Sequence, residues 1–104
     1  MRASPSSAGI GKRESSRLKL NIRGRLTSAR GTQLVELVDL SQTGARLELS
    51  ATLGLTEALV EWLDFEARGF VIWQDRRLCG LRFEEPIPSA WVTATRSASQ
   101  PTVR

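Results

Sequence analysis

The sequence predicts an all-β fold, because six short segments rich in Val, Ile, Leu, Trp and Phe follow one another at a spacing of about 8 to 12 residues. Apolar and polar residues alternate in several of these segments, and this period of two is typical of a strand with one buried face. No convincing helical period interrupts the series. Six short strands separated by turns favour a closed antiparallel barrel or a sandwich.

The first expected strand covers residues 18–26, and within it Gly24 indicates a bulge or a bend. In the second, residues 33–40, Val35, Leu37 and Asp39 share one face of the alternating pattern. The other four expected strands are residues 45–49, 58–65, 69–74 and 78–83, with turns at 29–31, 64–69 and 75–77.

The two ends of the chain differ from the strands in composition. Residues 1–11 are rich in Ser, Ala and Gly and are predicted to be a disordered tail. The barrel domain is expected to span residues 12–88, where Pro86 and Pro88 end the last strand. Residues 89–104 are expected to form a short helix around 91–95 or a flexible C-terminal tail.

Several classes of function are excluded by what the composition lacks. With no histidine and one cysteine, Cys79, the chain has no disulfide of its own and no ligand set for zinc or haem, so we expect no cofactor and a reduced, cytoplasmic compartment. No apolar run approaches the ~20 residues of a membrane helix, and no signal peptide is recognisable. The adjacent carboxylates Glu84 and Glu85 point to opposite faces of a strand, so we do not expect an enzyme.

The positive charge is concentrated in the first third of the sequence. The formal net charge is +4, of which residues 1–30 contribute +7 and residues 31–104 contribute −3. An anionic partner is therefore expected to meet the N-terminal third first.

Two motifs suit a planar, anionic ligand that contains guanine. Arg13 and Arg17 flank Glu-Ser-Ser, and Asp39, Ser41 and Gly44 lie in the sequence DLSQTG between two strands. Taken alone, Arg13 and Arg17 can be solvated surface charges, and Asp39, Ser41 and Gly44 can form an ordinary turn in which glycine supplies positive φ. Together, arginine forks can hold phosphate and the N7/O6 edge of guanine, while a carboxylate can accept from the N1/N2 edge.

The chain resembles the PilZ domain family from about Lys12 to Glu85. Five pieces carry the resemblance: the K-R-x-x-x-R run at 12–17, the strand at 18–27, the D-x-S-x-x-G turn with Ala-Arg-Leu at 39–47, and the segments at 70–73 and 79–83. The resemblance implies a six-stranded antiparallel β-barrel, commonly with a C-terminal helix packed on it. It also implies a receptor for the bacterial second messenger cyclic di-GMP.

The same resemblance implies roles for individual residues. Arg13 and Arg17 would bind phosphate and a guanine Hoogsteen edge, and Asp39 would accept from guanine N1/N2. Ser41 would bond phosphate or base, and Gly44 would permit the tight turn that aims these side chains.

Lys12 stands where the family often has another arginine. A lysine keeps the charge but loses the planar fork, so the ligand count is open between one molecule and a stacked pair. The N-terminal tail would fold over the ligand, and the changed surface would signal to a downstream protein that the sequence does not identify.

Two alternatives stay open at this point. The first is a nucleic-acid-binding β-barrel, which is disfavoured because residues 18–30 contain no aromatic side chain on which bases stack. The second is a degenerate PilZ-like module that docks proteins without binding a nucleotide. Trp62 and Trp73 are expected to pack in the core or at the barrel mouth rather than on a ligand, Trp91 to plug an open end, and Cys79 to be a buried, inert thiol.

Overall fold

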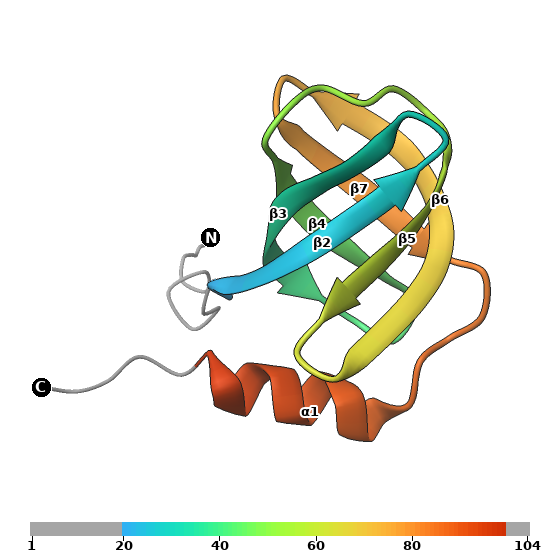
Figure 1. Ribbon diagram of the computed structural model, residues 1–104. Helices are drawn as coiled ribbons and strands as arrows, with labels where there is room; N and C mark the ends of the chain where they lie inside the picture. The colour runs from blue at the N-terminus through green and yellow to red at the C-terminus, as the bar shows by residue number, and fades with distance from the viewer. Residues whose placement is uncertain (1–19, 100–104) are drawn as a thin grey trace, which may run out of the picture.

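The computed structural model describes residues 20–99, which form a closed barrel of six antiparallel strands followed by one helix (Figure 1). Around the barrel the strands follow the order β2-β3-β4-β7-β6-β5, and β2 pairs with β5 to close it. The elements are β2 (Ile22–Ser28), β3 (Gly31–Leu40), β4 (Gly44–Leu49), β5 (Glu57–Trp62), β6 (Phe65–Asp75), β7 (Leu78–Phe83) and α1 (Ser89–Ala98). The predicted six-stranded antiparallel barrel is confirmed.

Hydrophobic side chains from every strand fill the interior. One row across four neighbouring strands consists of Ile22, Leu37, Leu47 and Cys79, all of them buried. Burying a side chain of this size contributes roughly 1.5–3 kcal/mol. The alternation seen in the sequence therefore sets which face of most strands points inward.

Gly24 lies in an unbroken stretch of pairing, so the β2 ladders contain no bulge at this residue, which was one of the two features predicted there. The glycine serves close packing instead. A methyl group at Gly24 would lie 2.7 Å from the Glu61 carbonyl oxygen and 3.2 Å from the Leu37 side chain. A side chain at this position would push the neighbouring strand away.

The turn between β5 and β6 differs from the one predicted over residues 64–69. The chain reverses at Leu63 and Asp64, and β6 already begins at Phe65. Leu63 takes the left-handed conformation with φ 52°, which glycine and asparagine adopt far more often than leucine does. Gly69 lies within β6, where the backbone of Arg82 in β7 leaves no room for a side chain.

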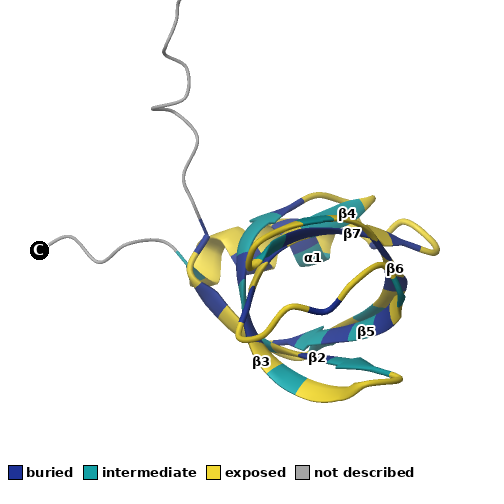
Figure 2. Cartoon of the chain, turned by 90° about the horizontal axis from the view of Figure 1, so that it is seen from above, coloured by how far each residue is buried: buried dark blue, intermediate teal, exposed yellow. Residues whose placement is uncertain are grey.

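Each open end of the barrel is covered. The loop 50–56 crosses one end, as Figure 2 shows, with Leu53 buried and its amide donating to Gln74 Oε1 at 3.1 Å. The helix α1 lies across the other end, where the Trp91 ring stacks on Phe65 with centroids 4.8 Å apart and meets Trp62 edge-on at 6.4 Å. Trp91 thus occupies the end that it was expected to plug.

The helix is longer than the predicted 91–95. Thr95 is fully buried, and its hydroxyl accepts a hydrogen bond from Trp62 Nε1 at 2.9 Å. The same hydroxyl donates to the Trp91 carbonyl at 2.7 Å. This contact with the core helps to hold the helix in place, because an isolated helix of this length is only marginally stable in water.

Candidate ligand-binding site on the outer face of the barrel

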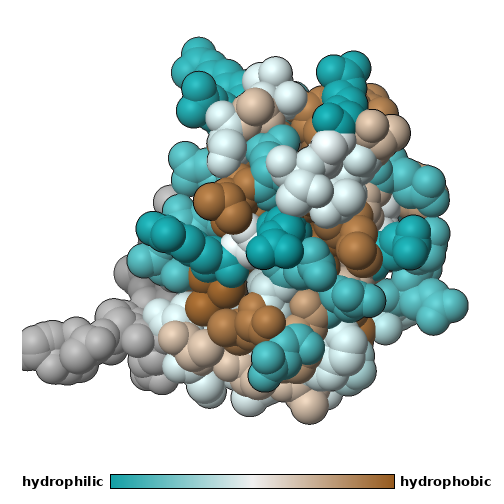
Figure 3. All heavy atoms as spheres, in the orientation of Figure 1, coloured by the Kyte–Doolittle hydropathy of each residue, from teal (hydrophilic) through white to brown (hydrophobic). Residues whose placement is uncertain are grey.

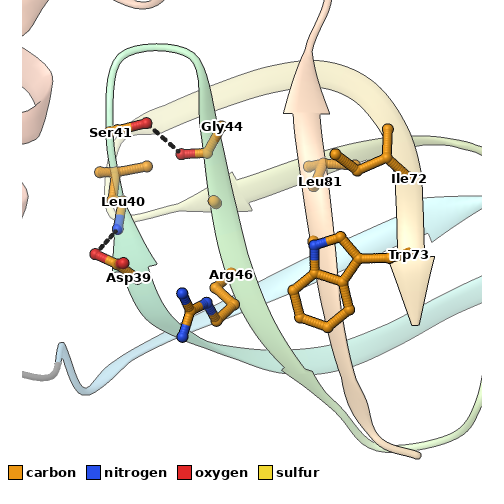
Figure 4. Close-up of a pocket in the computed structure, with 10 residues that line it drawn as sticks. Asp39, Leu40, Ser41, Gly44, Arg46, Ile72, Trp73 and Leu81 are labelled. Atoms are coloured by element: carbon orange, nitrogen blue, oxygen red, sulfur yellow. Dashed lines mark hydrogen bonds between the residues drawn. The ribbon is translucent and has the colours of Figure 1, made fainter. Parts of the chain in front are cut away.

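Four residues form a row across the outside of four adjacent strands. Asp39 of β3 pairs with Arg46 of β4, Arg46 pairs with Gly80 of β7, and Gly80 pairs with Trp73 of β6. Figure 4 shows the Arg46 side chain reaching toward Asp39 and the Trp73 indole reaching from β6 over β7. The row places an acceptor, a cation and an aromatic ring side by side.

A β-bulge in β3 puts Asp39 into this row. The register shifts between Leu37 and Asp39, so Val38 is an extra residue that has no partner in β4. After the bulge Leu40 turns into the core, where it is 1% exposed, and Asp39 lies half-buried at the outer surface. The expectation that Asp39 shares a face with Val35 and Leu37 is therefore wrong.

A second bulge, in β6, does the same for Trp73. The register shifts between Val71 and Trp73, which leaves Ile72 as the extra residue. Without this shift the period of two would send Trp73 inward beside Val71. Its side chain is instead 38% exposed, so Trp73 does not pack in the core, which was one of the two predicted positions beside the barrel mouth, whereas Trp62 is buried as expected.

The Trp73 indole depends on a glycine in the neighbouring strand. A methyl group at Gly80 would collide with three atoms of the indole ring. The ring covers the surface that the missing side chain leaves open, an arrangement in which an aromatic residue packs over a glycine across two strands. Gly80 is thus required for the position of Trp73.

Asp39 and Ser41 are fixed by local hydrogen bonds. Asp39 Oδ1 accepts from the Leu40 amide at 2.9 Å, and a carboxylate retains capacity for several further bonds. The Ser41 amide donates to the Gly44 carbonyl at 2.9 Å, and Ser41 Oγ accepts from the Thr43 amide at 3.3 Å. These bonds close the turn between β3 and β4.

Gly44 is needed for a different reason from the one expected. It is not among the described glycines with positive φ, which are Gly31 and Gly54. A methyl group at Gly44 would lie 2.5 Å from the Leu81 carbonyl oxygen of β7. The glycine therefore allows β4 and β7 to approach each other directly below the site.

A pocket of about 200 Å³ connects these residues. Of the predicted site residues it brings together Asp39, Ser41 and Gly44. Its other lining side chains, which the sequence analysis did not assign to the site, include Arg46, Ile72 and Trp73. The predicted residues Lys12, Arg13 and Arg17 lie outside the described part of the chain.

The chain enters the barrel beside this pocket. The amide of Leu20, the first described residue, donates to the Val38 carbonyl at 3.3 Å. Val38 is the bulge residue that precedes Asp39. The position from which the N-terminal motif extends is therefore adjacent to Asp39.

The cysteine of the described part of the chain is shielded from solvent. Cys79 is fully buried, and burial raises the pKa of its thiol to about 11, which keeps it protonated and unreactive near neutral pH. Within residues 20–99 no group of three or more His, Cys, Asp or Glu side chains is placed to hold a metal ion. No helix in the same range has the length and apolar character needed to cross a membrane.

Of three comparisons with known proteins, the one with family models gave a match. A search of curated proteins and a search of solved structures each found no match. The family model for the PilZ domain matches residues 11–93, which is most of the chain and includes all of the barrel strands. The chain belongs to the PilZ domain family, the family of cyclic di-GMP receptors.

Proposed function

We propose that this protein is a cyclic di-GMP receptor that binds the messenger on the outer face of β3, β4, β7 and β6. PilZ domains are binding and adaptor modules rather than enzymes. The observation that carries the proposal for this chain is the row of Asp39, Arg46 and Trp73 created by the two bulges. The proposal requires neither a metal nor a cofactor.

Each side chain in the row matches a part of the ligand. The Asp39 carboxylate accepts from guanine N1 and N2, an edge that arginine cannot satisfy. The Arg46 guanidinium donates to phosphate oxygens or to guanine N7 and O6, and the Trp73 ring stacks on a purine. Ser41 can add a hydroxyl to phosphate or base, since it both donates and accepts.

The N-terminal motif completes the site. The pocket of about 200 Å³ is smaller than the ~300–1,000 Å³ of common ligand pockets, so the described residues supply one wall. Two residues, Leu18 and Lys19, lie between Arg17 and Leu20, so the Cα atoms of Arg17 and Leu20 can be at most about 11 Å apart. Arg13 and Arg17, with Lys12 beside them, can therefore close over a ligand that lies on Trp73. Closure changes the surface presented to a downstream protein.

Calorimetric titration with cyclic di-GMP, GTP and single-stranded DNA, side by side, tests this function. Cyclic di-GMP should bind in the micromolar range or tighter, and the other two much more weakly. Because charge-assisted hydrogen bonds contribute roughly 1.5–3 kcal/mol, Arg17→Ala should weaken binding about ten- to a hundredfold.

Arg30→Ala is the matched control, because Arg30 lies exposed in the turn between β2 and β3 and carries the same charge. Its affinity should stay within about twofold of the wild type, since exposed charges away from a site contribute little. Equal losses in Arg17→Ala and Arg30→Ala, or preferred binding of DNA, would indicate a merely electrostatic surface.

A further inference from the structure

The turn between β3 and β4 that carries the candidate site, residues 39–44, is hydrogen-bonded to the helix α1 and is called the site turn below. Arg96, in the last turn of α1, donates through Nη2 to the Leu40 carbonyl oxygen at 3.2 Å. Leu40 lies between Asp39 and Ser41, and its own side chain is buried. The guanidinium therefore holds the peptide that connects the two polar residues of the site.

A second connection joins the same turn to the segment before α1. The Gln42 side chain donates to the Ile87 carbonyl at 3.0 Å, and the Ile87 amide donates to the Gln42 carbonyl at 2.8 Å. Ile87 is buried and precedes the first residue of α1 by two positions. The turn is thus bonded near both ends of the helix.

The helix is in turn anchored as one body to the barrel end. Thr95 is bonded to Trp62, and the Trp91 ring stacks on Phe65. In Figure 1 α1 lies under the end of the barrel where β2 begins and β3 ends. A displacement of α1 must therefore break the bonds of Arg96 and Gln42 or move the site turn with it.

From these contacts we infer that α1 and the ligand site are energetically coupled, with Arg96 and Gln42 as positioning residues for Asp39 and Ser41. A docked helix holds the turn in its binding geometry, and a bound ligand stabilises the docked helix. Such coupling is reciprocal, so whatever displaces α1 weakens ligand binding by the same factor. The part that concerns cyclic di-GMP rests on the proposed function, whereas the positioning of the turn does not.

Hydrogen exchange without ligand tests the positioning. In Arg96→Ala and in Gln42→Ala, the Ser41 amide should exchange at least about fivefold faster than in the wild type, because the turn opens more often. In both variants the exchange rate of the Leu53 amide, which is bonded to Gln74 at the other end of the barrel, should equal that of the wild type. As a second control, Arg30→Ala should leave the exchange rates of all amides outside the β2–β3 turn unchanged. Unaltered Ser41 exchange in both variants would overturn the inference, even if the protein proved to bind no cyclic di-GMP.

Ligand titration tests the coupling itself. Both variants should bind cyclic di-GMP about five- to tenfold more weakly than the wild type, and saturating ligand should slow exchange in α1 of the wild type. Gln42→Ala changes no charge, so its weaker binding cannot come from a change in net charge. The loss of affinity in Arg96→Ala should persist at about 0.5 M salt, where exposed charges are screened. Wild-type affinity in Gln42→Ala, or a loss in Arg96→Ala that vanishes at high salt, would contradict the coupling.

Discussion

Val38 and Ile72 each occupy a bulge, and each changes the direction of the side chain that follows it. Asp39 and Trp73 reach the outer face for this reason, whereas strict alternation would place both inside the barrel. Bulges are frequent next to binding sites because a single extra residue re-aims a side chain without breaking the sheet. The composition of the site thus depends on two single-residue irregularities.

Gly80→Ala tests the position of Trp73 at the residue scale. The new methyl group collides with the indole, which is partly exposed and can rotate away. Because stacking of a base on an aromatic ring contributes about 1–3 kcal/mol, binding of cyclic di-GMP should weaken about five- to a hundredfold. Calorimetric titration of Gly80→Ala, of Trp73→Ala and of the double variant measures how far the effect of Gly80 on ligand affinity depends on Trp73.

The double variant provides the internal control. If Gly80 acts only through the indole, Gly80→Ala should add no further loss once Trp73→Ala is present. Additive losses from the two substitutions would show that Gly80 acts through something other than the indole.

At the scale of elements, the sequence predicts the strands well because their buried positions follow a period of two. Leu26 and Leu47 lie between polar neighbours, and both are in the core. The bulge in β3 does leave a mark in this pattern, because strict alternation from Leu37 would bury the Asp39 carboxylate and expose Leu40. The bulge in β6 leaves none, since Ile72 and Trp73 are both apolar and fit either register. The turn at Leu63 was missed because a leucine adopts the conformation expected of glycine.

The candidate site was predictable in part. Asp39, Ser41 and Gly44 carry a motif, and the structure brings them into one pocket. Arg46 and Trp73 lie in segments that carry the family resemblance but were given no role in the site, because their contribution depends on pairing between strands that are distant in sequence. An outward tryptophan beside a glycine on the next strand becomes recognisable only once the register is known.

Thr95→Val tests the packing of α1 on the barrel. Valine has nearly the shape of threonine but leaves Trp62 Nε1 without its acceptor at a buried position, so unfolding should cost about 1–3 kcal/mol less. Thr93→Val is the control, because Thr93 lies exposed on the same helix. Urea denaturation should give a clear loss for the first variant and little change for the second. Equal losses of stability in the two variants would mean that the lower helix propensity of valine, and not the lost hydrogen bond, causes the effect.

At the scale of the whole molecule, the closed barrel excludes water from its single thiol. Above about pH 9 the unfolded chain loses the Cys79 proton, whereas the folded protein keeps it up to about pH 11. The folded state then binds more protons than the unfolded state, so stability falls as the pH rises through this interval.

Denaturation of the wild type and of Cys79→Ala between pH 8 and 11 measures this contribution. The wild type should lose stability relative to the variant by up to about 1.4 kcal/mol per pH unit above pH 9. Below pH 9 the difference between the two proteins should be constant. Parallel pH profiles throughout the range would mean that the thiol is not shielded from solvent.

The central proposal concerns the whole binding surface: Asp39 would recognise guanine, and the arginines around it would bind the phosphates. Calorimetric titration of the wild type and of Asp39→Ala with cyclic di-GMP and with cyclic di-AMP tests it most directly. Both ligands carry the same phosphates, but only guanine has N1 and N2 donors for a carboxylate. The control is Asp64→Ala, in the exposed turn between β5 and β6.

The wild type and Asp64→Ala should bind cyclic di-GMP far more tightly than cyclic di-AMP. Asp39→Ala should lose about ten- to a hundredfold in affinity for cyclic di-GMP and little for cyclic di-AMP, so that selectivity falls. Equal affinity of the wild type for the two ligands, or selectivity that survives in Asp39→Ala, would contradict recognition of guanine at this site.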